Sequence, residues 1–339
     1  MSRYASIVFE ASYTTFIYYP RKTVSDRRRF IIVINAAAGN QKNEHLLECI
    51  SRHIPTESLL KTDQLHPGPD FEQDVDRAIR DAAAEKAVLL IAGGDGTVNT
   101  FLGRMSVLNS TVGKTTLAII PRGTFNYFAR DHGIPTEANE AIINALEGVA
   151  QPVPLCWVNR EPFCVSASLG VYPKIMKARE RILAKTGRSR FAAVLTSIWV
   201  FLTNQKRSLI SIEHGTQVRQ MKTPLVVVTC SQTQIETFDM PEASHLDKGF
   251  MILFAMRGRT SIRMLFALLK SAFGGIRNVE EISYEPVQKL QITYPRIRRR
   301  KTIEVAVDGE IRRLQNPLIF RVEHEAAQVI VPAKSREDE

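Results

Sequence analysis

One short stretch limits the fold of this chain more than any other. It is Gly-Gly-Asp-Gly-Thr at residues 93–97, which follows four apolar residues at 88–91 and precedes the mixed segment 98–102. A buried strand that runs through a glycine turn into a helix aims free backbone N–H groups and the helix dipole at one point. Glycine lets a phosphate approach that backbone closely. The sequence therefore predicts an enzyme that uses a nucleotide, of the kinase type.

A second stretch of similar character follows the next apolar run along the chain. Residues 121–126, Pro-Arg-Gly-Thr-Phe-Asn, come directly after the strand-like run 117–120. Open α/β sheets bind their ligands at the carboxyl ends of the strands, so both loops are expected at one edge of the sheet. Asp95 adds a carboxylate where a metal-bound polyphosphate would lie.

Composition narrows the class of protein. The chain has 339 residues, 44% of them apolar, which is enough for two packed domains. A net charge of +10 favours an acidic partner, such as a nucleotide, a nucleic acid or an anionic membrane, although many proteins are simply basic. No motif supports nucleic-acid binding. The four cysteines are scattered, so neither a zinc site nor a disulfide framework is expected.

Two segments bear on where the protein is found in the cell. Residues 1–20 have no apolar core of a secretory signal, and residues 191–203 are too few to span a bilayer. We expect a soluble, cytoplasmic protein that attaches at most to a membrane surface.

The order of apolar runs predicts two domains. Strands at 30–34, 88–91 and 117–120 alternate with helices at 41–53, 71–82 and 138–149, which indicates a doubly wound α/β domain. Beyond Pro152-Val153-Pro154, strand-like runs dominate and predict an antiparallel β-sandwich, interrupted by helical segments at 190–204 and 261–273. The expected divisions are a leader or edge strand at 1–29, the α/β domain at 30–153, the β-rich domain at 154–317 and a return segment with a tail at 318–339.

Three motifs together resemble the nucleotide site of the diacylglycerol kinase catalytic family. They are Asn35 to Gly39, residues 93–97, and residues 121–126 followed by Phe-Ala-Arg at 128–130. The glycine motif is shared with NAD kinases and phosphofructokinases, whereas the second loop narrows the resemblance to lipid kinases. The similarity covers roughly residues 30–333 and is greatest to bacterial lipid kinases, which also resemble sphingosine kinases.

The resemblance implies ATP-dependent transfer of the γ-phosphoryl group to a lipid hydroxyl, with Mg²⁺. Phosphoryl transfer needs positioning and charge neutralisation more than covalent chemistry, which agrees with such loops. The residues that the family assigns to the nucleotide site are Asn35, Gly39, Gly93, Gly94, Gly96, Thr97, Gly123, Thr124, Asn126 and Glu310. Asp95 and Asp308 are the expected catalytic carboxylates and Mg²⁺ ligands.

The Asp-Gly-Glu at residues 308–310 has two interpretations. Asp-Gly between alternating apolar residues is a strong signal for a type I′ hairpin, and by itself it indicates only a turn. The family places a general base at this Asp, which takes the proton of the lipid hydroxyl. Asp308 and Glu310 match that motif, and a hairpin tip can carry a catalytic carboxylate.

Two positions depart from the family pattern. Tyr127 stands where relatives often have Asp, and Lys248 replaces one Asp of a turn that can hold an accessory Mg²⁺. Segments 190–199 and 263–270 combine apolar faces with basic flanks and could meet a membrane, or could simply be core helices. The basic cluster around Arg296, Arg298, Arg299, Arg300 and Lys301 could bind anionic head groups, or be a solvated edge.

Alternative functions stay open at this level. An NAD kinase of the same superfamily would phosphorylate NAD without lipid vesicles. A non-catalytic module would bind nucleotide and membrane without turnover, which the changes at Tyr127 and Lys248 make conceivable. The sequence names neither the acceptor lipid nor the oligomeric state, so a homodimer also stays open.

Overall fold

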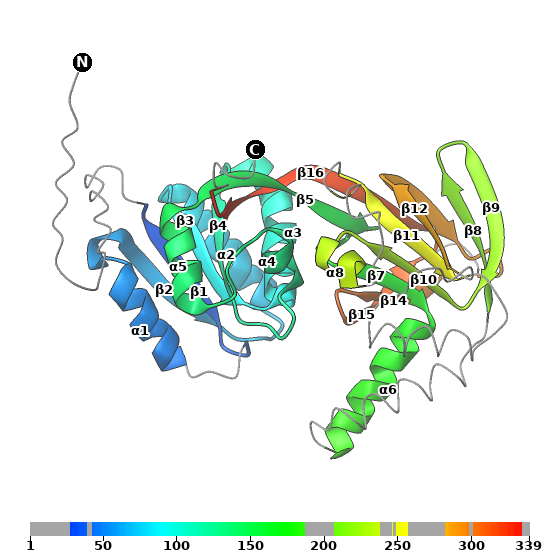
Figure 1. Cartoon of the computed structure of the whole chain (residues 1–339), viewed down its shortest axis with the longest axis horizontal. Helices are drawn as coiled ribbons and strands as arrows, with labels where there is room; N and C mark the ends of the chain where they lie inside the picture. Colours follow the sequence, from blue (N-terminus) through cyan, green and yellow to red (C-terminus); the bar gives the residue numbers. More distant parts are fainter. Residues whose placement is uncertain are drawn as a thin grey trace, which may run out of the picture.

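Two lobes lie side by side along the long axis of the molecule (Figure 1). The computed structural model describes residues 28–38, 43–186, 207–237, 246, 249–256, 282–297 and 301–333, with the side chains of 179–186 excepted. A ten-stranded sheet runs through both lobes in the order β2-β1-β3-β4-β16-β13-β8-β9, with β5 and β6 attached beside β16, and a six-stranded sheet belongs to the second lobe.

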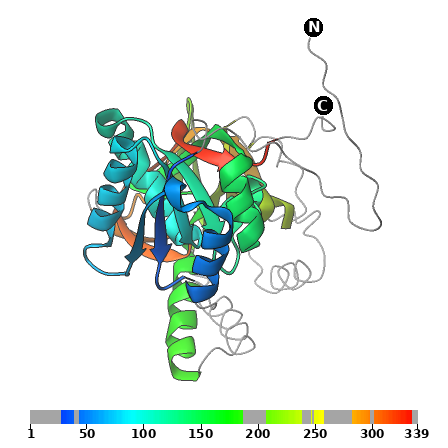
Figure 2. The ribbon, with the colours of Figure 1, turned by 90° about the vertical axis from the view of Figure 1, so that its left-hand side faces the viewer.

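The first lobe is a parallel sheet covered on both faces. Its strands are β1 (Phe30–Asn35), β2 (Leu59–Leu65), β3 (Val88–Gly93) and β4 (Thr116–Pro121). Its helices are α1 (Asn43–His53), α2 (Phe71–Ala84), α3 (Asp95–Val112), α4 (Tyr127–Asp131) and α5 (Ala138–Glu147), with a 3₁₀ turn η2 at Thr56–Ser58. Figure 2 shows α2 and α3 on one face of the sheet and α1 and α5 on the other. Successive residues of β1 and β3 enter opposite cores, which is why those strands are continuously apolar.

The second lobe is a sandwich. Its six-stranded antiparallel sheet has the order β12-β11-β10-β7-β14-β15 and faces the antiparallel end of the large sheet. The strands of the smaller sheet are β7 (Ser166–Gly170), β10 (Leu225–Thr229), β11 (Met251–Met256), β12 (Ile282–Val287), β14 (Thr302–Val307) and β15 (Glu310–Gln315). The opposing strands are β5 (Val149–Val158), β6 (Glu161–Phe163), β8 (Ser208–His214), β9 (Gln217–Thr223), β13 (Lys289–Thr293) and β16 (Leu318–Val331). One apolar core joins them, with Val228 of one sheet and Ile292 and Phe320 of the other fully buried.

Two helices complete the second lobe. The short helix α8 (Gln232–Thr237) contacts α4 of the first lobe, and α6 (Val171–Thr186) extends away from both sheets (Figure 1). Among the helices that the structure describes, none is both long and apolar enough to span a lipid bilayer.

The predicted fold class, a doubly wound α/β domain followed by an antiparallel β-sandwich, is confirmed. Some observed elements begin or end at other residues than the sequence predicts. Pro152-Val153-Pro154, expected between domains, lies inside β5, an edge strand on which proline is tolerated. The expected divisions at 153/154 and 317/318 therefore fall within β5 and at the start of β16. The predicted helices at 190–204 and 261–273 lie outside the described residues.

Candidate active site between the lobes

The glycine turn between β3 and α3 is shaped by contacts that leave no room for a side chain. A Cβ atom on Gly93 would lie 2.5 Å from Cβ of Thr97. The Thr97 hydroxyl accepts a hydrogen bond of 2.8 Å from the amide of Asn35 at the end of β1. Asn35 and Thr97 are thus brought together at the carboxyl ends of β1 and β3, and the first turn of α3 directs its backbone N–H groups beyond them.

The second loop packs directly against the first. A Cβ atom on Gly123 would lie 2.9 Å from Cα of Gly94, and the backbone N–H of Arg122 donates to the carbonyl of Gly93 at 2.8 Å. Asn126 has a left-handed backbone with φ of 51°, and its side-chain oxygen accepts from the N–H of Gly123 at 2.8 Å. The two loops therefore form one surface. Thr124 is exposed on it, whereas Gly39 lies outside the described residues.

Asp95 points toward the short helix α4. Its Oδ1 accepts the backbone N–H of Phe128 at 3.1 Å, so the carboxylate caps that helix. Burial raises the pKa of the Asp95 carboxyl, and the backbone N–H groups of residues 126–128 oppose part of the rise. In this arrangement Asp95 connects the two glycine-containing loops.

Asp308 lies at the tip of the β14–β15 hairpin in the second lobe. The φ angles of 45° at Asp308 and 86° at Gly309 are those of a type I′ turn, as the sequence predicts. The Asp308 carboxylate accepts backbone N–H groups of the segment that joins β6 to β7: Cys164 at 2.8 Å, Val165 at 3.0 Å and Ser166 at 2.8 Å. Enclosure of the carboxylate raises the pKa of Asp308 to about 6, although these donors favour the charged form.

The Cys164 thiol marks the point at which both lobes meet. It lies 3.4 Å from Asp308 Oδ2, and the charges of Asp308, Asp95 and Asp131 help burial to raise its pKa well above the usual range. Asp131, at the end of α4, also accepts the backbone N–H of Thr233 from α8 at 2.7 Å. Asp308 therefore contacts the buried thiol directly, whereas Asp95 and Asp131 of the first lobe act on its pKa only through their charge.

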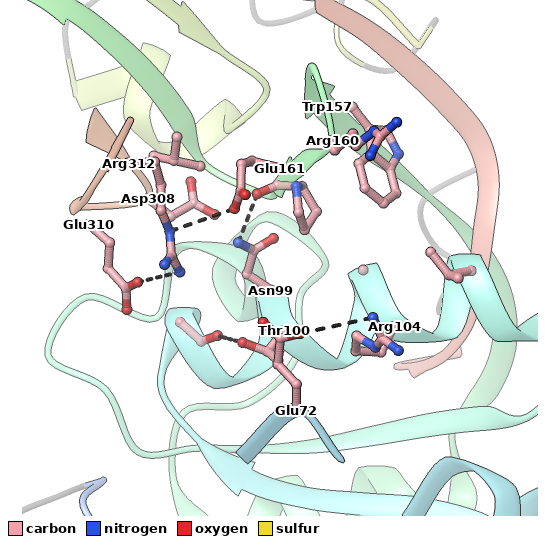
Figure 3. A pocket seen from close by; sticks show the side chains of 15 residues that line it. Glu72, Asn99, Thr100, Arg104, Trp157, Arg160, Glu161, Asp308, Glu310 and Arg312 are labelled. Carbon is pink, nitrogen blue, oxygen red and sulfur yellow. Dashed lines mark hydrogen bonds and ion pairs between the residues drawn. The ribbon is translucent and has the colours of Figure 1, made fainter. Parts of the chain in front are cut away.

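A cavity of about 200 Å³ lies between α3 and the hairpins β5–β6 and β14–β15 (Figure 3). It is lined by Glu72, Gly96, Asn99, Thr100, Gly103, Arg104, Val107, Trp157, Arg160, Glu161, Pro162, Val307, Asp308, Glu310 and Arg312. Three of the residues predicted for the site, Gly96, Asp308 and Glu310, are among these. The cavity begins at Gly96, in the first turn of α3, and continues along that helix.

Several lining residues escaped prediction although their spacing carries a signal. Arg312 lies two residues after Glu310, on the same face of β15, and its guanidinium is 2.7 Å from Glu310 Oε2 and 3.6 Å from Glu161. Asn99 and Gly103 follow Gly96 at helical spacing on one face of α3. A helix predicted to start near Gly96 would have placed Asn99 and Gly103 on the same face as Gly96.

The residues expected to hold Mg²⁺ do not form a metal site by themselves. Asp95 and Asp308 both direct carboxylate oxygens at backbone N–H donors. Across the part of the chain that the structure describes, His, Cys, Asp and Glu side chains form no group of three or more with the geometry to bind a metal. The accessory turn with Asp247 and Lys248 lies outside the described residues.

Comparisons with known proteins agree with this architecture. Residues 29–158 match the family model of the diacylglycerol kinase catalytic domain. The diacylglycerol kinase of Bacillus subtilis (strain 168) is 26% identical over 242 residues, which are 70% of this chain and 76% of that protein. A protein of Serratia proteamaculans (strain 568), named a probable YegS-like lipid kinase, is 34% identical over 108 residues, which are 31% of this chain and 35% of that protein.

The overall architecture also matches a solved structure. The crystal structure of a diacylglycerol kinase from Bacillus anthracis strain Sterne superposes with a TM-score of 0.65 at 20% identity. The superposition covers 91% of this chain and 98% of that one, so both lobes share the fold.

Proposed function

We propose that this chain is an ATP-dependent lipid kinase that phosphorylates a lipid hydroxyl. Residues 29–158 match the model of the diacylglycerol kinase catalytic domain, and the chain is similar to a bacterial diacylglycerol kinase over 70% of its length. One observation carries the proposal. Gly96, in the first glycine-containing loop, and Asp308 of the second lobe line the same cavity, and the 121–126 loop packs against the first loop. A phosphate-binding surface and an enclosed carboxylate on opposite sides of a cleft are the parts that phosphoryl transfer to an alcohol requires.

ATP is expected to lie with its phosphates on the joined loops. Backbone N–H groups at the start of α3 and in the 121–126 loop would receive the phosphate oxygens, with Thr124 exposed beside them. The cavity along α3 begins at Gly96, so it offers space for the nucleoside end of ATP. Glu310, which lies near Gly96, supplies acceptor oxygens there for sugar hydroxyls.

Asp308 is proposed as the general base. With a pKa of about 6, its carboxyl is ionised at neutral pH and still basic enough to accept a proton. Three backbone N–H donors fix its orientation, whereas the thiol of Cys164 at 3.4 Å is a weak donor that a substrate hydroxyl can replace. The hydroxyl proton passes to the carboxylate as the hydroxyl oxygen bonds to the γ-phosphorus and ADP departs with the bonding electrons.

Mg²⁺ is proposed as the companion of ATP. It binds proteins through one or two carboxylates together with phosphate oxygens and water, and it neutralises phosphate charge. Because the described carboxylates form no site of their own, no step above depends on a protein-bound metal. Asp95 and Asp308 remain the proposed ligands once the phosphates are present.

The acceptor is proposed to be a membrane lipid reached by peripheral attachment to an anionic surface. The net charge of +10 supports attraction to such a surface. Arg296 and Lys301, both exposed next to β13 and β14, belong to the basic cluster that would contact the head groups. The apolar segments proposed for insertion lie outside the described residues.

The test is a transfer assay with labelled ATP, Mg²⁺ and mixed lipid vesicles, comparing the wild type with Asp308→Asn. Asparagine keeps the shape of the side chain and removes its charge. Label that appears on a lipid with the wild type and falls by at least about 100-fold with the variant supports the proposal. Label on NAD identifies an NAD kinase, and bound ATP without transfer to any acceptor identifies a binding module. Either result overturns it.

A further inference from the structure

The chain passes between the lobes twice, along β5 and along β16, and the two strands form one ribbon (Figure 1). At one end β16 pairs with β13 in the second lobe, and at the other it pairs in parallel with β4 in the first. Helix α3, which begins at the glycine turn of residues 93–97, packs along this ribbon in a common apolar core. Asn99 and Gly103 of α3 line one cavity with Asp308, so the placement of α3 on the ribbon sets where this wall of the cavity lies.

The ladder of the ribbon is interrupted where it passes α3. Leu155 pairs with Glu323 and Val153 pairs with Ala327, so residues 324–326 stand opposite Pro154 alone. Pro154 has no N–H to donate to β16 at this point. A bulge of this kind bends a strand and redirects its side chains.

Glu323, at the start of the bulge, connects α3 with β5. Its Oε1 accepts the hydroxyl of Ser106 from α3 at 2.8 Å, and its Oε2 accepts the indole N–H of Trp157 from β5 at 2.9 Å. Arg321 lies 3.5 Å from Glu323 Oε2 and places its guanidinium 4.8 Å from the centre of the Trp157 ring. One half-exposed carboxylate thus holds the helix and the strand together.

Two further hydrogen bonds of α3 end on the backbone of neighbouring strands. The Asn109 amide donates to the carbonyl of Ala326 at 3.0 Å, and the Asn99 amide donates to the carbonyl of Pro162 at 3.0 Å. Apolar packing is not directional, so hydrogen bonds such as these set the position of the helix along its own axis. Two of these three acceptors are backbone carbonyls, which no substitution removes. The third is the side chain of Glu323.

We propose that Glu323 is a positioning residue that fixes the register of α3 on the β5–β16 ribbon. This inference rests on the proposed kinase function for its effect on catalysis, but not for its structural content. With Glu323 in place, Ser106 and Trp157 are tied to one carboxylate, and the wall of the cavity formed by α3 keeps its position opposite Asp308. Without it, the part of α3 beyond its first turn can shift along the apolar face, while the contacts of Thr97 with Gly93 and Asn35 are kept.

The kinetic test compares Glu323→Ala with Glu325→Ala, a matched control that removes an exposed carboxylate from the same bulge. We expect kcat per active site to fall by about 10-fold or more in Glu323→Ala, because small misplacement of reacting groups is costly. The KM for ATP should change little, and Glu325→Ala should match the wild type. Glu323→Gln should restore kcat, since glutamine can accept from Trp157 and donate to the Ser106 oxygen.

A distance measurement tests the inference without using activity. Spin labels on Thr111→Cys, in the last turn of α3, and on Val218→Cys, 66% exposed on β9, report the position of the helix against the second lobe. A shifted or broadened distance distribution in Glu323→Ala, absent in Glu323→Gln and Glu325→Ala, supports the proposal. If Glu323→Ala fails to fold, Ser106→Ala removes the helix side of the contact and is measured instead.

The outcomes separate this inference from the proposed function. An unchanged distance distribution together with unchanged kcat in the folded variant overturns the positioning role. A wild type that phosphorylates no lipid overturns the kinase proposal, and the distance distribution then decides the register of α3 by itself.

Discussion

The two sides of the candidate site are built in different ways. On the nucleotide side, glycine backbones touch one another, and added atoms at Gly93 or Gly123 would lie within 3 Å of existing ones. On the acceptor side, a carboxylate is enclosed by N–H groups that are 142 to 144 residues away in the sequence. One side depends on the absence of side chains and the other on charge. Substitutions should therefore act sterically on the first and electrostatically on the second.

The largest effect is expected on the steric side, from Gly123→Ala. The new Cβ would lie 2.9 Å from the Gly94 backbone and 2.7 Å from Asn126 Oδ1, so the loops must separate. Overpacking of this kind costs about 1–3 kcal/mol of unfolding free energy. Titration calorimetry should show ATP affinity reduced by at least about 10-fold, which corresponds to 1.4 kcal/mol.

Gly68→Ala is the control for that substitution, because no atom lies within 4 Å of its added Cβ. It should leave ATP affinity unchanged. Equal affinities for Gly123→Ala and the wild type would show that the backbone contact between the loops is not needed for nucleotide binding.

On the charge side, pH should act through Asp308. As a general base it must be ionised, so kcat/KM, which reports the free enzyme, should fall tenfold for each pH unit below about 6 and level off above it. Stability changes in the opposite direction. Between the ordinary carboxyl pKa and about 6, the folded chain holds a proton that the unfolded chain has released. The contribution of Asp308 to unfolding free energy therefore decreases as pH rises through this window. Stopped assays and thermal melts from pH 4.5 to 8 measure both trends, and a flat kcat/KM profile through pH 6 would contradict the assignment.

A smaller effect is expected where the two sides meet at Glu310. Arg312→Ala removes the partner of a glutamate that is 62% exposed, and exposed ion pairs contribute about 0.2–1 kcal/mol. The KM for ATP should therefore change by no more than about fivefold, with kcat nearly unchanged. Arg313→Ala is the matched control, because that side chain is 75% exposed and contacts Glu304 instead. A kcat that falls with Arg312→Ala alone would give this arginine a direct part in transfer.

The smallest effect is expected from Cys164→Ala. The variant removes a weak donor to Asp308 and leaves the backbone N–H groups in place. Because the thiol favours the charged carboxylate, its loss should move the acid limb of the kcat/KM profile slightly to higher pH. The measurement is the midpoint of that limb in wild type and variant. A midpoint displaced to lower pH would mean that the thiol does not donate to Asp308.

Strands buried on both faces were predictable, and partly exposed edge strands were not. β1, β3 and β4 are continuous apolar runs, and the predicted segments agree with them to within two residues at each end. β2 and β9 escaped prediction because they carry many polar residues, with a single buried position each. These segments are strands because they pair with a neighbouring strand, and not because their own residues favour an extended backbone.

The candidate site divides in the same way. The two glycine-containing loops and the type I′ turn at Asp308 could be predicted, because glycine spacing and turn chemistry act over a few neighbouring residues. The folded chain alone shows that Asp95 caps α4, that Cys164 lies against Asp308, and that Glu323 connects α3 with the ribbon. These contacts join segments 33 to 217 residues apart, and no local pattern records which carboxylate the folded chain will enclose.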